Sequence, residues 1–342
     1  MLEYRFYSNS LWREYHMEDM LFMQNSDTAK ELLSLGYKTD YDHHIHTKYS
    51  DGSFSLKEII KFAKETQLKR IVITDHNNIL EVSNELETIS KKELGLLKVF
   101  VGAEIACKVL DQKTGMYIPI ELLYYGPNPK NVQAFIDKYN YSMVPQNEQL
   151  QFLIKQCEKY NLKHSEGLQV PKGMFATEYL CKDLIKYPEN KAFFDSTYPI
   201  VYSTPKLFFK KFCIHPSSDF YIDTTKNLPM AKDVANMALA NGGITIVAHP
   251  CLYIYETKDE VLSFLGYIRE TTRAAGIEVF HSSHTFEQRN YLYQFAKQYN
   301  LLIGGGSDFH SGPQTVVGFG RTDQILSLSG HDFDWIEDIF II

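Results

Sequence analysis

The chain has 342 residues, of which 44% are hydrophobic and 23% charged, and its formal net charge is −7. This length suits one large domain or two ordinary ones, and the composition excludes a disordered chain, a coiled coil and a collagen-like repeat. The negative charge disfavours a protein that binds nucleic acid over its whole surface, although a local basic face stays open.

The cysteine pattern and the apolar stretches indicate a cytoplasmic protein. The five cysteines are widely spaced and form no C-x-x-C pair, so neither a disulfide framework nor a zinc ribbon is expected. The first residues, MLEYRFYSNSLWREY, lack the apolar core of a signal peptide. No stretch approaches 18 consecutive apolar residues, so we expect no membrane span.

Strand and helix patterns alternate along most of the chain. Residues 1–40 are predicted to be an N-terminal extension with a short helix capped by Asp27, and Ser55 and Glu58 form a capping box that opens a helix through Thr66. Strands are expected over 70–74, 98–105, 118–125, 243–249, 276–280 and 301–306, with late helices near 258–275 and 285–299. This alternation predicts an α/β protein with a parallel sheet or barrel.

The middle of the chain has a different character. Residues 128–230 are helical and loop-like, are punctuated by prolines, and contain more lysines than acidic residues. We therefore predict an inserted helical subdomain at 128–230, while 41–127 and 231–342 form the main domain. The apolar ending DFDWIEDIFII is expected to dock on the core or on a second subunit, and the termini are the candidate contacts for a homo-oligomer or a protein partner.

Histidine and acidic residues recur directly after the apolar strands. His44 and His46 lie two apart in an extended segment, so both imidazoles project to the same side. The remaining candidates are Asp51, His76, Glu104, His249, Asp308 and His310. A single His at a strand end is more often structural than a ligand, but so many groups converging on one face of a barrel indicate a metal site.

The number of candidate ligands predicts more than one cation. About eight imidazole and carboxylate groups are too many for one tetrahedral metal, and burying them together is costly unless cations compensate their charge. Mixed nitrogen and oxygen donors suit Zn, Mn or Fe rather than Ca. We therefore expect two or three divalent metal ions.

The motifs DHHIHTKYSDG, ITDHN, GAEI, AHP and GGSDFHSG together resemble those of the PHP (polymerase and histidinol phosphatase) metal-dependent phosphoesterases, over roughly residues 41–320. The resemblance implies a distorted (β/α)7 TIM-like barrel with up to three metals at the carboxyl ends of its strands. It also implies that the eight candidates above are metal ligands, with Glu104 as the bridging carboxylate. The insert and the segment GIEVFHSSHTFEQ are similar to the branch that cleaves nucleotides and RNA 5′ ends.

Two positions depart from that branch, and others suggest substrate contacts. Glu121 stands where the branch commonly has a His, so either it binds a metal with altered preference or only two metals remain. His43 occupies a position that is usually apolar and is interpreted as a structural histidine or as a residue that supports the ligands without binding metal. His284 is the candidate general acid or phosphate contact and, with Asp308, the predicted catalytic residue. Lys172 and Arg321 are the predicted substrate-binding residues.

The predicted function is metal-dependent hydrolysis of phosphate esters in nucleotides or at the 5′ ends of short nucleic acids, with a metal-activated hydroxide as the nucleophile. Two alternatives stay open. One is a small-metabolite phosphatase resembling those that act on histidinol phosphate, and the other is a catalytically silent binding or regulatory module. Neither the metal nor the exact substrate follows from the sequence.

Overall fold

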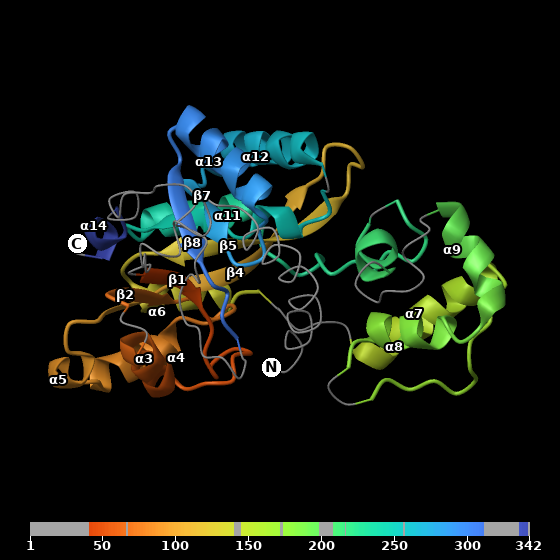
Figure 1. Ribbon diagram of the computed structural model, residues 1–342, viewed down its shortest axis with the longest axis horizontal. Helices are drawn as coiled ribbons and strands as arrows, with labels where there is room; N and C mark the ends of the chain where they lie inside the picture. The colour runs from red at the N-terminus through yellow and green to blue at the C-terminus, as the bar shows by residue number, and fades with distance from the viewer. Residues whose placement is uncertain are drawn as a thin grey trace, which may run out of the picture.

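The computed structural model describes residues 41–65, 68–139, 145–171, 174–197, 208–215, 217–255, 257–310 and 335–340. The predicted N-terminal extension and its helix therefore lie outside the described residues. Figure 1 shows a body of sheets and surrounding helices, with a lobe of helices α7, α8 and α9 at one side. Among the described residues no helix has the length and apolarity needed to cross a membrane.

The described strands form two sheets. The first has the order β1-β2-β3 and is parallel. The second has the order β4-β5-β6-β7-β8, in which β5 pairs antiparallel with both neighbours and β6, β7 and β8 are parallel. The strands are β1 Tyr41–Ile45, β2 Arg70–Ile73, β3 Lys98–Val101, β4 Ala103–Leu110, β5 Tyr117–Tyr125, β6 Ile244–Val247, β7 Gly276–His281 and β8 Leu302–Gly306. The prediction of a mixed α/β fold with parallel strands is confirmed.

The segment expected to be one strand over 98–105 is two strands that belong to different sheets. The break falls at Gly102, where a Cβ atom would lie 2.3 Å from the carbonyl oxygen of Tyr124. Only glycine permits so close an approach of two backbones. The antiparallel pairing of β4 with β5 was also not predicted, and its cause is the short connection between Leu110 and Tyr117, because a parallel pair needs a crossover of a dozen or more residues.

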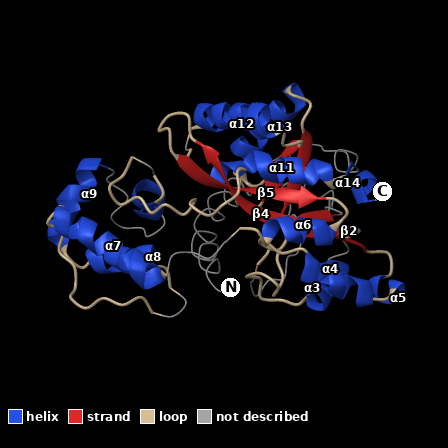
Figure 2. Ribbon diagram, turned by 180° about the vertical axis from the view of Figure 1, so that it is seen from behind, coloured by secondary structure: helices blue, strands red, loops and turns tan. Residues whose placement is uncertain are grey.

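Helices pack around the sheets. In the view of Figure 2, α11, α12 and α13 lie above and α3, α4 and α6 below, and α6 and α11 contact each other. The helices of this body are α3 Leu56–Glu65, α4 Leu80–Thr88, α5 Lys91–Leu94, α6 Pro129–Ile136, α11 Ala231–Ala240, α12 Lys258–Thr272, α13 Phe286–Gln298 and α14 Trp335–Phe340, with a 3-10 turn at Pro250–Leu252. The capping box of Ser55 and Glu58 is present, since each side chain bonds to the other residue's backbone or hydroxyl.

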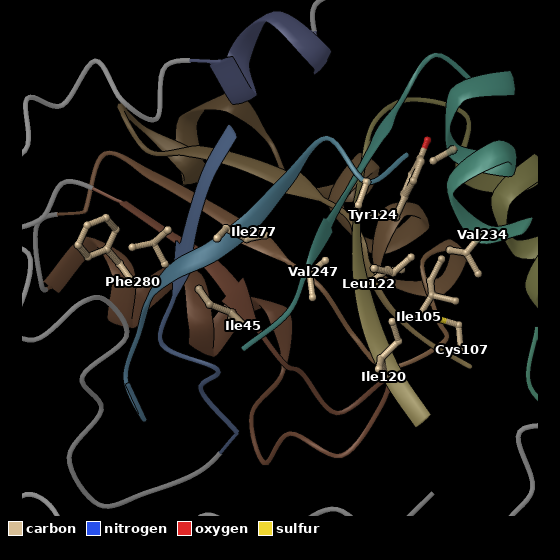
Figure 3. Close-up of a cluster of buried hydrophobic side chains, with 14 of the residues drawn as sticks. Ile45, Ile105, Cys107, Ile120, Leu122, Tyr124, Val234, Val247, Ile277 and Phe280 are labelled. Atoms are coloured by element: carbon tan, nitrogen blue, oxygen red, sulfur yellow. The ribbon is translucent and has the colours of Figure 1, made fainter. Parts of the chain in front are cut away.

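The main core lies between these helices and the sheets. In Figure 3, Ile105, Ile120 and Leu122 of the antiparallel pair face Val234 of α11, while Val247 and Ile277 continue the cluster toward β1. Burying each such side chain contributes about 1.5–3 kcal/mol. This packing holds rigidly the strands whose ends carry the candidate ligands.

The lobe of helices has a separate hydrophobic core. It is built by Leu150 and Leu153 of α7, Leu180 of α8 and the clustered rings of Phe208 and Phe220, among others. Its elements are α7 Gln146–Lys159, α8 Ala176–Leu184, a 3-10 turn at Pro188–Asn190, α9 Lys191–Thr197 and a π-helical turn at Phe209–Cys213. Helix α6 falls inside the predicted insert but packs Val132 and Ile136 into the main core, so the second core begins at α7.

The C-terminal helix α14 docks on the body of its own chain. Ile336 is fully buried against Val72 and neighbouring strand residues, and Trp335 Nε1 donates to the carbonyl of Ile303. Glu337 accepts a hydrogen bond from Arg70 at 2.9 Å. The apolar ending was expected to dock either on the core or on a second subunit. The described helix docks on the core.

Candidate metal centre

The predicted ligands meet at one place, beside the carboxyl ends of β1, β2, β6 and β8. His44 lies in β1 and His46 directly follows it, and the loop after His46 carries Asp51. The other groups follow β2, β6 and β8 or lie in the antiparallel pair: His76, Glu104, Glu121, His249, Asp308 and His310. Three overlapping groups of neighbouring donor atoms result, namely His46, Asp51, His76 and His310; His44, His46, Glu104 and Asp308; and His76, Glu104 and Glu121.

Glu104 occupies the centre of the cluster. Its Oε2 lies 3.2 Å from His44 Nε2, 3.3 Å from His46 Nε2 and 3.1 Å from His76 Nδ1. Its Oε1 lies 2.9 Å from His249 Nε2. The carboxylate is fully buried, so one negatively charged group faces four imidazoles from three different strand ends. This is the position expected of a carboxylate that bridges two cations.

Asp308 and Asp51 flank the central carboxylate. Asp308 Oδ1 is 3.1 Å from His46 Nε2 and 3.4 Å from His44 Nε2, while Asp51 Oδ1 is 3.3 Å from His310 Nε2. The φ angle of Asp308 is 55°, in the left-handed region that a non-glycine residue rarely adopts. Such local strain is held by the surrounding structure and is typical of functional sites.

The charges of the cluster shift the pKa values of its members in opposite directions. Burial alone would raise the pKa of Glu104, but the imidazoles of His44 and His76 hold it well below its ordinary value. Burial lowers the pKa of His46, yet the neighbouring carboxylates of Asp308 and Glu104 outweigh this effect and raise the value to about 10. Likewise Glu104 raises the pKa of His249 to about 9 against the effect of burial. Glu104 is therefore ionised, as a carboxylate that binds a metal must be.

The spacing and the unmet bonding of these groups fit divalent cations. Donor atoms bound to one metal at about 2.1 Å, at tetrahedral or octahedral angles, lie about 3.0–3.4 Å apart, which is the spacing around Glu104. Glu104 Oε2, Asp308 Oδ1 and both ring nitrogens of His46 are buried without a hydrogen-bond partner. Buried polar atoms rarely lack partners, and a cation satisfies all of these at once. Divalent metal binding follows from this donor set.

Glu121 joins the cluster from the middle of β5. Its Oε1 lies 3.6 Å from His76 Nδ1 and its Oε2 lies 3.3 Å from His249 Nε2. Burial, together with the nearby charge of Glu104, raises the pKa of Glu121 to about 8. Glu121 is thus placed to bind a cation. The number of metals, two or three, depends on whether Glu121 acts as a ligand.

Three buried groups beside the ligands did not stand out as ligand partners in the sequence. Glu278 lies inside β7 and reaches His44, and Asp75 accepts hydrogen bonds from the backbone and hydroxyl of Thr47, which fixes the loop that carries Asp51. The third is His281, and its Nε2 lies 3.5 Å from Asp308 Oδ2. Position directly after a strand is the sequence signal for Asp75.

The remaining predicted residues are less central. His284 is buried, and its Nδ1 bonds to the carbonyl of Val279 at 3.1 Å, behind His281. His43, interpreted as structural, accepts a hydrogen bond from Arg70 Nε at 3.1 Å on the other side of β1. Lys172 and Arg321 lie outside the described residues, so their predicted substrate contacts stay predictions.

Comparisons with known proteins agree with this geometry. Residues 42–194 match the model of the PHP domain. Over 287 residues the chain is 23% identical to phosphoribosyl 1,2-cyclic phosphate 1,2-diphosphodiesterase of Eggerthella lenta, which covers 81% of this chain and 97% of that protein. It is also 23% identical to the 5′-3′ exoribonuclease Rnm of Escherichia coli, over 83% of this chain and 89% of the relative.

Solved structures share the fold. An amidohydrolase of Chromobacterium violaceum superposes with a TM-score of 0.53 at 17% identity and covers 82% of this chain and 90% of its own. A candidate metal-dependent phosphoesterase of Bifidobacterium adolescentis gives a TM-score of 0.50 at 20% identity, with coverages of 84% and 94%. The motifs, their convergence and the match of residues 42–194 to the PHP domain agree in a resemblance of this chain to the PHP family.

Proposed function

We propose that the protein is a metal-dependent phosphoesterase that hydrolyses phosphate ester bonds of nucleotides or of the 5′ ends of short nucleic acids. The observation that carries this proposal is the buried carboxylate of Glu104 facing four imidazoles, since this donor set fits divalent cations. Of the similar proteins named above, one is a phosphoribosyl 1,2-cyclic phosphate 1,2-diphosphodiesterase and one a 5′-3′ exoribonuclease.

Two or three divalent cations, of Mn, Zn or Fe, are proposed to occupy the cluster. His46, Asp51, His76 and His310 would hold one, and His44, His46, Glu104 and Asp308 would hold a second. Glu121, with His76 and Glu104, would complete a third site, and His249 lies beside Glu104 and Glu121. When bound, the cations supply a water of lowered pKa and neutralise charge on the phosphate oxygens.

The side chains of this chain then have separate tasks. Glu104 keeps the ligands of neighbouring cations at a fixed spacing, and Asp308 presents Oδ1 to the ligand cluster while Oδ2 faces His281. His281, the last residue of β7, and His284, three residues further on, are the groups proposed to supply a proton or a hydrogen bond to the substrate phosphate. Lys172 and Arg321 are proposed to bind substrate charge.

The fold behind this site is proposed to be the distorted (β/α)7 barrel that the resemblance implies. Its support is a set of hydrogen bonds between the sheets: His46 N to Phe309 O and Asp308 N to His44 O, both 2.9 Å, and Glu104 N to Thr74 O, 3.1 Å. The division into a barrel (41–127 and 231–342) and a helical insert (128–230) is part of the same proposal. It is supported by the two separate hydrophobic cores.

The test is hydrolysis by the full chain loaded with manganese. A short 5′-phosphorylated oligoribonucleotide, a nucleoside 3′,5′-bisphosphate and a ribose 1,2-cyclic phosphate are compared, with Asp308→Ala as the inactive control. Release of mononucleotides or of free phosphate, abolished in the variant, supports the proposal and identifies the bond that is cut. Activity on histidinol phosphate alone would favour the metabolite phosphatase, and inactivity on every substrate despite bound metal would favour a binding module.

A further inference from the structure

Strand β7 directs two polar side chains, three residues apart, toward the metal centre. In a regular strand Glu278 and His281 would lie on opposite faces, because side chains alternate. The pairing of β7 with β8 shifts register between Glu278 and Phe280, which marks a β-bulge. A bulge changes the direction of the following side chains, so Glu278 reaches His44 and His281 reaches Asp308.

Both carboxylate oxygens of Glu278 bind groups that belong to predicted ligands. Oε1 lies 3.1 Å from His44 Nδ1, and Oε2 accepts a hydrogen bond of 2.8 Å from the backbone N–H of His249. Glu278 is fully buried, and a buried carboxylate is costly unless its oxygens are hydrogen-bonded. One carboxylate thus connects ligands that come from β1 and from the end of β6.

The contact with His44 determines which ring nitrogen faces the cluster. An ionised carboxylate only accepts hydrogen bonds, so Nδ1 of His44 carries a proton and donates it to Glu278. Nε2 then points to the cluster, 3.2 Å from Glu104 Oε2 and 3.4 Å from Asp308 Oδ1. A histidine ligand whose other nitrogen donates to a carboxylate has a fixed tautomer and a fixed ring orientation.

The contact with His249 acts on the backbone. The φ angle of His249 is 22°, a conformation that side-chain-bearing residues seldom adopt. The hydrogen bond to Glu278 Oε2 satisfies the N–H at this unusual turn, where the chain leaves β6. His249 Nε2 consequently reaches Glu104 Oε1 at 2.9 Å and Glu121 Oε2 at 3.3 Å.

We propose that Glu278 is a positioning residue of the metal centre, which holds His44 in its Nδ1–H tautomer and fixes the backbone of His249 so that both present Nε2 to the cations. This inference rests on the proposed function. His44, Glu278 and His281 could in principle form a further cation site of their own. The geometry favours positioning, since Glu278 Oε2 is already bound to a backbone N–H and Nδ1 of His281 accepts from the N–H of Ser283 at 3.1 Å.

The experiment measures metal binding by the full chain rather than activity. Glu278→Gln keeps the size of the side chain but replaces one accepting carboxylate oxygen by a donating amide group. Glu278→Asp keeps the negative charge, but the shorter side chain cannot reach both His44 and the backbone of His249. The matched control is Asp183→Asn in the helical lobe, because Asp183 is also buried and also accepts a backbone N–H, from Ser165 at 2.7 Å. Mn²⁺ affinity is measured by chelator competition, and stoichiometry by elemental analysis.

We expect Glu278→Gln to weaken Mn²⁺ binding about 10–100-fold at unchanged stoichiometry, with a smaller loss in Glu278→Asp and none in Asp183→Asn. Wild-type affinity in both Glu278 variants would overturn the inference, and so would the loss of one equivalent of metal, because that result makes Glu278 a ligand. Failure of the wild-type chain to bind Mn²⁺ would instead contradict the proposed function.

A second measurement needs no variant and so does not depend on the variants folding. In the zinc-loaded wild-type protein, labelled with ¹⁵N at histidine, the tautomer of His44 is assigned from the nitrogen chemical shifts. A proton on Nδ1 is expected. A proton on Nε2, with Nδ1 bound to the metal, would overturn the proposed role of Glu278.

Discussion

Metal binding is expected to release protons, because several imidazoles of the cluster hold them when no cation is bound. The pKa of His46 is raised to about 10 and that of His249 to about 9, by Asp308 and Glu104 in the first case and chiefly by Glu104 in the second. Both residues must lose a proton to bind a cation. Near pH 7.5 these two residues therefore release about two protons on binding, and the affinity for Mn²⁺ rises about 100-fold for each unit of pH.

Calorimetry of the chelator-treated protein measures this number directly. Mn²⁺ is titrated at pH 7.5 in two buffers of different ionisation enthalpy, and the difference in observed heat gives the protons released. Glu121, whose pKa is raised to about 8 by burial and by Glu104, adds a third proton if it binds a cation. Release of fewer than one proton, with an affinity independent of pH, would refute the reasoning.

The same pKa values fix the sign of the stability change in the metal-free protein. The folded-state pKa of His46, about 10, lies above the ordinary value of 6.5 expected in the unfolded chain. Its contribution to the free energy of unfolding is fully present below about pH 6.5 and is lost as the pH rises through 10. The melting temperature of metal-free protein should fall over this window, and added Mn²⁺ should raise it most at the alkaline end.

Further variants test individual parts of the site. Glu104→Gln should abolish tight Mn²⁺ binding and phosphoester hydrolysis together, as measured by chelator competition and a kinetic assay; retained binding would contradict its bridging role. His281→Phe should lower kcat more than His284→Phe, because only His281 faces Asp308; the opposite order would return the catalytic role to His284. Gly306→Ala should lower the free energy of unfolding by about 1–3 kcal/mol, because the new Cβ would lie 2.1 Å from His44 Cβ. The control is Gly266→Ala on α12, where a Cβ meets no neighbouring atom, and thermal denaturation should show no loss of stability for it.

The sequence could indicate the candidate ligands because most of them lie shortly after an apolar strand whose pattern is easy to recognise. His249 comes directly after the buried run ITIVA and His76 lies two residues after RIVIT, and parallel strands bring their carboxyl ends to one edge of a sheet. The position of a residue relative to its strand therefore determines its place in the molecule. For the same reason the mixed α/β class was predictable without any knowledge of packing.

Two features could not be predicted because they depend on contacts between distant segments. The break at Gly102 exists only because the carbonyl of Tyr124 approaches it, and no local pattern indicates this contact. The bulge in β7 moves one residue out of the alternation, so Glu278 in GIEVF looks like an ordinary strand residue. The antiparallel course of β5 differs from these, because the short connection between Leu110 and Tyr117 leaves no room for a crossover and could have indicated it.

The break at Gly102 also explains how Glu104 becomes the centre of the cluster. Glu104 is the second residue of β4, and at the start of an ordinary strand it would lie at the edge opposite to the other ligands. Because β4 continues directly from β3, Glu104 emerges where β3 ends, and it pairs in parallel with His76 beyond the end of β2. The antiparallel partner β5 then places Glu121 opposite Ala106, two residues further along β4 on the inner side. The unpredicted change of sheet is thus what brings both carboxylates to the imidazoles.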